Sequence, residues 1–234
     1  VLTLVRTFNS IVYSPYASRY NHFVGFKDYE GLKSFVNKMI TMFAPVLTIP
    51  IFTLALLAKP FVISWIGPNY VDASLLVTFL VLSFVPNFVK DPLSSYLIAM
   101  ENNRILVKFN MLMPIVYWCG ILLTINIWGL LSFALFKFIV PFITTIGYWF
   151  VVKKEFNSSG GKLTSFITVL KTIIPSVVIL LCISLLVYPH MYFEKYSLAL
   201  GFNILIMGVC VFCGILVSIP FNNYYKAELK RIFK

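Results

Sequence analysis

Four ionisable residues stand inside long apolar stretches of this sequence. They are Arg6, Lys90, Asp91 and Lys137. Placing a charged side chain at the depth of a membrane costs about 3 kcal/mol or more, so such a residue normally faces protein or water and marks a functional path. Lysine and arginine there would bind an anion, phosphate above all, because a low local dielectric strengthens ion pairing. A carboxylate beside them could bind a coupling ion or tune the charge of the site.

Lys90 and Asp91 belong to a polar stripe on one expected helix. The stripe follows the three-and-four spacing of a single helix face and contains Ser83, Asn87, Lys90, Asp91, Ser94 and Ser95. Pro86 and Pro92 flank the two charges, and each removes a backbone hydrogen bond, so we expect a bend here. Adjacent helix residues do not face each other. We therefore expect an opposite charge on another helix, in a water-filled lumen or, as the alternative, in a buried structural ion pair.

Two further expected helices have similar stripes. Arg6 shares a face with hydroxyl residues, namely Thr3, Thr7, Ser10, Ser14 and Ser18, and Lys137 shares one with Pro141, Thr144, Thr145 and Tyr148. Both cations also have a simpler interpretation, since each could lie close enough to the outer interface to snorkel. The candidate substrate-binding residues are thus Arg6, Asn87, Lys90 and Lys137, with Asp91 as a coupling or tuning carboxylate.

The composition places these residues in an integral membrane protein. Of the 234 residues, 60% are hydrophobic and only 12% are charged, too apolar a mixture for one soluble core. A membrane-spanning helix needs about 20 apolar residues. We expect an all-α fold with about seven such helices, spanning approximately 1–20, 38–58, 73–100, 107–126, 129–152, 170–188 and 197–220. Short connections make neighbouring spans antiparallel.

The basic residues give the chain an orientation. The connections on one side hold only Lys59 and Lys195, whereas those on the other side and the tail hold Arg19, Lys27, Lys33, Lys38, Arg104, Lys108, Lys153, Lys154, Lys162, Lys171, Lys226, Lys230, Arg231 and Lys234. Basic residues favour the cytoplasmic side. We therefore expect a multi-pass protein of the cytoplasmic (inner) membrane with a cytoplasmic C-terminus, and the net charge of +11 needs no nucleic-acid partner.

Two cytoplasmic connections have characters of their own. Residues 26–37 place apolar side chains at helical spacing among charged ones, which predicts a helix lying along the inner interface. Residues 156–169 contain "FNSSGGKLTSF" and read as a flexible linker. The linker divides the first five spans, 1–155, from a last pair with its basic tail, 170–234. That pair has no charged stripe, so we expect it to face lipid, outside any pathway.

The sequence offers little that would support catalysis or a cofactor. The two histidines, His22 and His190, fall in connections on opposite sides, and the four cysteines lie within apolar runs without the spacing of a metal site. No phosphate loop or nucleophile motif is present. We expect no enzyme activity, no metal and no cofactor.

Parts of the sequence resemble a known family. The segments that resemble it are "FNSIVYSPYASRY", the run from "KDYEGLKSFVNKMI" through "LAKPFVISWIGPNYVDASLLV" to "VPN", and "SSYLIAMENNRI". Residues 8–155 are similar to the C-terminal half of polysaccharide transporters (O-antigen-type flippases) of the multidrug, oligosaccharidyl-lipid and polysaccharide exporter superfamily. Residues 156–234 are similar in topology only, although "YYKAELKRIFK" resembles that family's basic tail. Where family members often have Gly-Lys, this chain has "MENNR".

The resemblance implies two pseudo-symmetric lobes around a cationic cavity. Residues 1–155 would form five helices of the second lobe, and the first lobe would lie upstream in the same chain. The implied activity is alternating-access transfer of an undecaprenyl-diphosphate-linked oligosaccharide from the inner to the outer leaflet, with glycan polymerase or assembly machinery as further partners. A cation-coupled drug exporter of the same superfamily, a membrane-embedded glycan polymerase and a non-transporting assembly scaffold are alternatives.

Overall fold

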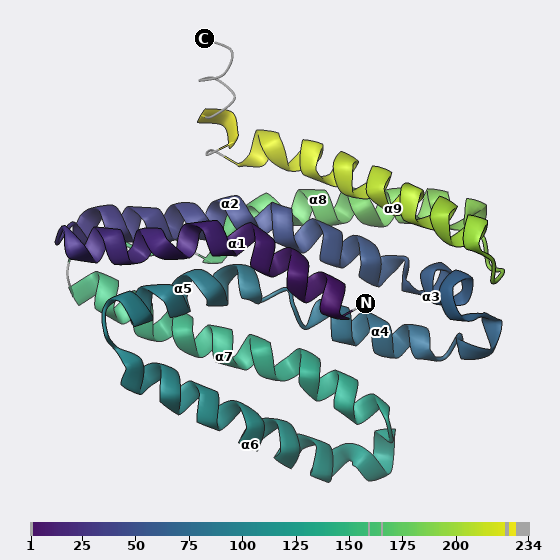
Figure 1. The fold of residues 1–234 in the computed structure, drawn as a ribbon, viewed down its shortest axis with the longest axis horizontal. Coiled ribbons are helices and arrows are strands. Elements are labelled where there is room, and N and C mark those ends of the chain that lie inside the picture. Colours follow the sequence, from purple (N-terminus) through teal and green to yellow (C-terminus); the bar gives the residue numbers. More distant parts are fainter. Residues whose placement is uncertain (1, 159, 165, 223–224, 228–234) are drawn as a thin grey trace.

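The protein is a bundle of long helices (Figure 1). The computed structural model describes residues 2–158, 160–164, 166–222 and 225–227, apart from the side chains of residues 2, 4–6, 8, 9, 12, 17 and 166. The helices are α1 (Leu2–Gly25), α2 (Tyr29–Leu56), α3 (Ala58–Ile66), α4 (Ala73–Leu82), α5 (Asn87–Ala99), α6 (Asn103–Trp128), α7 (Leu131–Ser158), α8 (Phe166–Val187) and α9 (Ser197–Ser218). Short 3-10 turns cover Pro68–Tyr70 (η1), Tyr188–His190 (η2) and Ile219–Phe221 (η3), and the described residues include no strand.

Six stretches of this bundle are long and apolar enough to cross a membrane. They are α2, the α4–α5 pair, α6, α7, α8 with η2, and α9 with η3. The all-α fold is thus confirmed for the described residues, and the six stretches are consistent with a membrane protein. They match the predicted spans within a few residues at most ends. The described part of the first predicted span, residues 2–20, is also helical as part of α1, but α1 is not among the six, so a seventh span stays a prediction.

Helix α2 is the centre of the packing. Its most apolar window is 67% buried, against 11% for α6. Leu32, Val36 and Ile40 are inaccessible, and α2 contacts α1, α4, α5, α8 and α9. By contrast, α6 packs mainly on α7 and exposes large apolar side chains such as Leu123, which is the surface expected to face lipid.

The segment predicted to form a separate interfacial helix, 26–37, joins the second span instead. Asp28 caps α2 by accepting a hydrogen bond from the backbone N–H of Gly31 at 2.8 Å, and the helix then continues to Leu56. Leu32, Phe35 and Val36 are buried in the core. The amphipathic spacing is real, but these three side chains cover protein, whereas Phe26 and Tyr29 are exposed. Whether the start of α2 also touches the inner interface remains a prediction.

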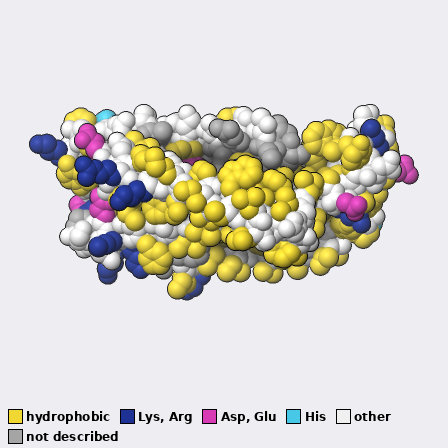
Figure 2. Space-filling view, turned by 90° about the horizontal axis from the view of Figure 1, so that it is seen from below, with side chains coloured by type: hydrophobic (Ala, Val, Ile, Leu, Met, Phe, Trp, Pro, Cys, Tyr) yellow, Lys and Arg dark blue, Asp and Glu magenta, His cyan; other side chains and the backbone are white. Residues whose placement is uncertain are grey.

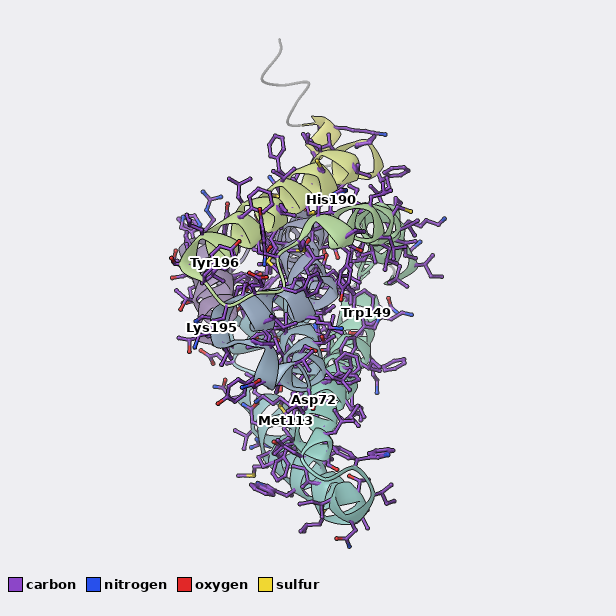
Figure 3. The ribbon with its side chains drawn as sticks, turned by 90° about the vertical axis from the view of Figure 1, so that its right-hand side faces the viewer. Asp72, Met113, Trp149, His190, Lys195 and Tyr196 are labelled. Atoms are coloured by element: carbon purple, nitrogen blue, oxygen red, sulfur yellow. The ribbon has the colours of Figure 1, made fainter. Side chains whose placement is uncertain are left out.

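Charged side chains gather at one end of the bundle. Figure 2 shows most lysine and arginine side chains of this face at its left end, where α1 meets α2 in Figure 1, with an apolar surface beyond them. Figure 3 views the opposite end, where Asp72, His190, Lys195 and Tyr196 lie on the connections before α4 and between α8 and α9. The distribution agrees with the charge asymmetry of the sequence.

Hydrogen bonds attach α8, α9 and their flanking segments to the rest. The amide of Asn37 donates to the carbonyl of Lys162 at 2.9 Å and accepts from the N–H of Thr164 at 2.8 Å. At the other end, buried Asn203 donates to the carbonyls of Tyr192 and Pro60 and accepts from the N–H of Tyr192. The two bonds of Asn37 therefore hold the predicted flexible linker, residues 156–169, on α2.

Asn222 adds a bond to a carbonyl that a proline leaves free. The carbonyl of Thr41 would normally accept from the N–H of residue 45, but Pro45 has none. The Asn222 amide donates to this carbonyl at 2.8 Å, and the hydroxyl of Tyr225 donates to the neighbouring carbonyl of Met42. Asn222 is fully buried, so this carbonyl is paired away from solvent.

Candidate functional site

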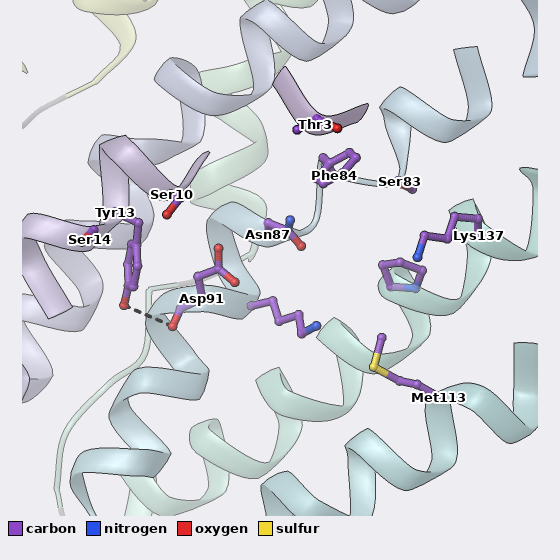
Figure 4. A pocket seen from close by; sticks show the side chains of 12 residues that line it. Thr3, Ser10, Tyr13, Ser14, Ser83, Phe84, Asn87, Asp91, Met113 and Lys137 are labelled. Carbon is purple, nitrogen blue, oxygen red and sulfur yellow. Dashed lines mark hydrogen bonds between the residues drawn. The ribbon is translucent and has the colours of Figure 1, made fainter. Parts of the chain in front are cut away.

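A polar cavity of about 760 Å³ lies between α1, the α4–α5 pair, α6 and α7 (Figure 4). Three predicted site residues, Asn87, Lys90 and Asp91, line it from α5, and a fourth, Lys137, lines it from α7. The remaining lining residues are Thr3, Ser10, Tyr13, Ser14, Ser83, Phe84, Met113 and Pro141. Residues of all three predicted stripes thus meet in one space, which the pattern on any single helix could suggest but not establish.

A break in the third span shapes the cavity wall. Helix α4 ends at Leu82, a turn follows from Ser83 to Pro86, and α5 begins at Asn87. The predicted bend is confirmed at Pro86, whereas Pro92 lies inside α5. Lys90 therefore does not lie on one straight helix with the residues of α4.

The turn keeps its backbone groups paired. The N–H of Phe84 donates to the Val81 carbonyl at 3.1 Å, and that of Val85 donates to the Leu82 carbonyl at 3.0 Å. The Ser83 hydroxyl donates to the Leu80 carbonyl at 2.6 Å. Irregular backbone is tolerated in a membrane where it is buried in protein or lines a cavity. The turn can therefore present Ser83 and Phe84 to the cavity while the last carbonyls of α4 keep their hydrogen bonds.

Helix periodicity explains why three polar residues of α5 reach the cavity together. Asn87, Lys90 and Asp91 are spaced by three and four positions and share one face. Ser94 and Ser95 continue the predicted stripe but do not line the cavity, and the Ser94 hydroxyl donates to the Asp91 carbonyl at 3.0 Å. Only the N-terminal part of the stripe therefore lines the cavity.

The cavity charges do not pair with each other in the described part of the chain. No described side chain forms an ion pair with Lys90, Asp91 or Lys137 within 4.0 Å, so the expected counter-charge from another helix is not found there. The backbone carbonyl of Asp91, not its carboxylate, accepts from the Tyr13 hydroxyl of α1 at 3.1 Å, in addition to the Ser94 hydroxyl of its own helix. Two ammonium groups and one carboxylate thus share the space, which leaves it net positive.

Helix α1 supplies hydroxyl groups on the facing side. Thr3, Ser10, Tyr13 and Ser14 line the cavity at helical spacing, and all but Tyr13 belong to the predicted stripe. Arg6 is the remaining predicted site residue. Its side chain lies outside the described residues, so its role stays a prediction based on its position between Thr3 and Ser10.

Other predicted polar residues have structural roles. Thr144 and Thr145 are buried and bond to the carbonyls of Val140 and Pro141 on their own helix. Tyr148 packs on Phe109, with ring centroids 4.7 Å apart. Of the predicted stripe on α7, only Lys137 and Pro141 line the cavity. Sequence reasoning missed Tyr13, Phe84 and Met113, because aromatic and methionine side chains look like ordinary core residues in an apolar chain.

No family model, curated protein or solved structure matches the chain. Among the described residues, no group of three or more His, Cys, Asp or Glu side chains is arranged to hold a metal ion.

Proposed function

We propose that this chain belongs to a membrane transporter that moves a lipid-linked oligosaccharide between leaflets, with the diphosphate of the lipid bound in the polar cavity. The observation that carries the proposal is the cavity itself. Lys90 and Lys137 reach it from two helices, with Asn87 and the α1 hydroxyls beside them. In a low dielectric, ammonium groups bind phosphate oxygens strongly, and hydroxyls and amides suit a glycan.

The surroundings of the cavity support a lipid-linked substrate. Six stretches of the chain are suited to crossing a bilayer, so a charged headgroup could occupy the cavity while its hydrocarbon tail stays in the membrane. Asp91 would reduce the positive charge of the site or take up the coupling cation. The sequence resemblance to polysaccharide transporters supports the same substrate class.

The proposal includes a topology. With α1 as a seventh span, α1–α7 would form the five-span half of a two-lobed transporter, and α8 and α9 would be the accessory pair. The lysine-rich end would face the cytoplasm, with the C-terminus on that side, as the positive-inside rule predicts for the inner membrane. The open polar side of the cavity would then face the other lobe.

The direct test neutralises the cavity lysines in the full-length protein. Lys90→Gln and Lys137→Gln would be expressed in cells lacking the chromosomal gene, with surface glycan measured per inserted protein. Loss of one charge-assisted hydrogen bond, about 1.5–3 kcal/mol, corresponds to about a 10- to 100-fold loss of transport. Lys59→Gln, an exposed lysine on the outer connection, is the control and should leave transport unchanged. Normal glycan with both cavity variants would refute the site.

A further inference from the structure

A second, smaller space adjoins the polar cavity. It measures about 280 Å³ and lies between α6 and α7, lined by Met113, Pro114, Tyr117, Trp118, Lys137, Val140 and Pro141. Three residues, Met113, Lys137 and Pro141, line both spaces. Figure 4 shows Met113 and Lys137 on two facing helices, α6 and α7. Lys137 thus belongs to both sites.

The smaller space is rich in aromatic surface. Tyr117 and Trp118 lie edge to face with ring centroids 5.7 Å apart, and Trp118 makes a similar contact with Phe133 on α7 at 6.4 Å. Trp118 nevertheless keeps 54% of its surface exposed. The negative face of an aromatic ring attracts the weakly positive hydrogens of a packed ligand. A flat, partly held indole next to a lysine is therefore suited to a ring with an anionic substituent.

Two prolines add hydrogen-bond acceptors to the same region. Pro114 and Pro141 line the space and have no N–H, so the helices supply no usual donor to the carbonyls of Asn110 and Lys137, four residues earlier. Carbonyls released in this way accept hydrogen bonds from other groups. Hydroxyl groups of a ligand are suitable donors. Aromatic faces, carbonyls without their usual helix donor and one cation together suit a sugar phosphate.

We infer that the space between α6 and α7 is a saccharide subsite, an inference that rests on the proposed function and specifies it. The sugar next to the diphosphate packs on Trp118 and Tyr117, and its hydroxyls donate to the free carbonyls. Lys137 binds the phosphate at the junction between the sugar and the lipid. The subsite would make the protein distinguish a glycosylated carrier from a bare one.

Binding of two probes to the purified full-length protein tests this subsite. The probes are undecaprenyl diphosphate and the same lipid with one N-acetylhexosamine. We expect Trp118→Ala to weaken binding of the glycosylated lipid about three- to tenfold, the usual worth of an aromatic contact, and to leave the bare lipid unchanged. Trp118→Phe keeps an aromatic face and should retain binding within about twofold. Trp128→Ala removes an exposed tryptophan of the same helix that lines neither space, and should change neither affinity.

The outcomes separate the subsite from the proposed function. Equal affinity of the wild-type protein for both lipids, or an equal effect of Trp118→Ala on both, would overturn the subsite, and Trp118 would then be a bilayer-facing side chain. Binding of both lipids that is lost in Lys90→Gln would still support the proposed function. Binding of neither lipid by the wild-type protein would overturn both ideas together.

Discussion

The bond between Asn222 and α2 gives a quantitative prediction. Replacing Asn222 by alanine leaves the Thr41 carbonyl buried without a donor, because Pro45 cannot supply one. An unsatisfied buried acceptor costs about 1–3 kcal/mol, and side-chain hydrogen bonds measured between membrane helices average about 0.6 kcal/mol with a maximum near 1.7. We expect Asn222→Ala to lower the free energy of unfolding by about 1–2 kcal/mol.

A double-mutant cycle isolates the reason for this loss. Pro45→Ala restores an N–H four residues after Thr41, so the helix itself can pair the carbonyl. In that background, Asn222→Ala should cost about 1 kcal/mol less than in the wild-type chain. Unfolding would be followed by circular dichroism in mixed micelles of increasing sodium dodecyl sulfate. Asn21→Ala, an exposed asparagine of α1, is the control and should change stability by less than about 0.5 kcal/mol.

The cycle would refute the reasoning if the two effects were additive within about 0.5 kcal/mol, the range seen for independent sites. Additivity would mean that Asn222 stabilises the protein through packing or through its other contacts, not through the proline-released carbonyl.

Two further predictions concern the cavity and the α6–α7 interface. In a background without the four native thiols, cysteines at positions 87, 90 and 137 should react with a small water-soluble reagent at least about tenfold faster than one at apolar, exposed position 123, which we expect to face lipid. Equal rates at all four positions would contradict a wet cavity. Gly120→Val should lower the free energy of unfolding by about 1–3 kcal/mol, the usual cost of overpacking, because a β-carbon at Gly120 would collide with the Phe136 ring. An unchanged unfolding transition in the same micelle assay would contradict the close packing of α6 on α7.

Hydropathy predicted most of the fold because a membrane imposes a length and a composition on each spanning helix. The apolar stretches of α6 and α9, for example, lie within a few residues of their predicted limits. Hydropathy could not predict that residues 29–37 extend α2, because a helix face covered by protein and one covered by lipid have the same spacing. The connection 59–72 likewise gave no sign of α3.

The candidate site was predictable at its charged residues and not at its walls. A lysine or aspartate in an apolar stretch is conspicuous, and the period of α5 placed Asn87, Lys90 and Asp91 on one face. That Lys137 would share their cavity depends on how α5 packs against α7, which no local pattern encodes. Asn37, Asn203 and Asn222 were similarly inconspicuous, since their partners are backbone groups far away in the sequence.

The bonds that hold α8 and α9 to the rest of the chain limit how the protein could move. Asn37 holds the entry to α8, Asn222 holds the exit from α9, and Asn203 ties the connection between the two helices to residue 60. Close packing of Ile49 against Gly214 adds a contact midway. These attachments, to α2 and to α3 directly after it, link α2, α8 and α9 at both ends and in the middle. A rocking motion would therefore carry all three helices together, and the hinge would have to lie elsewhere, with the turn from Ser83 to Pro86 as the natural place for it.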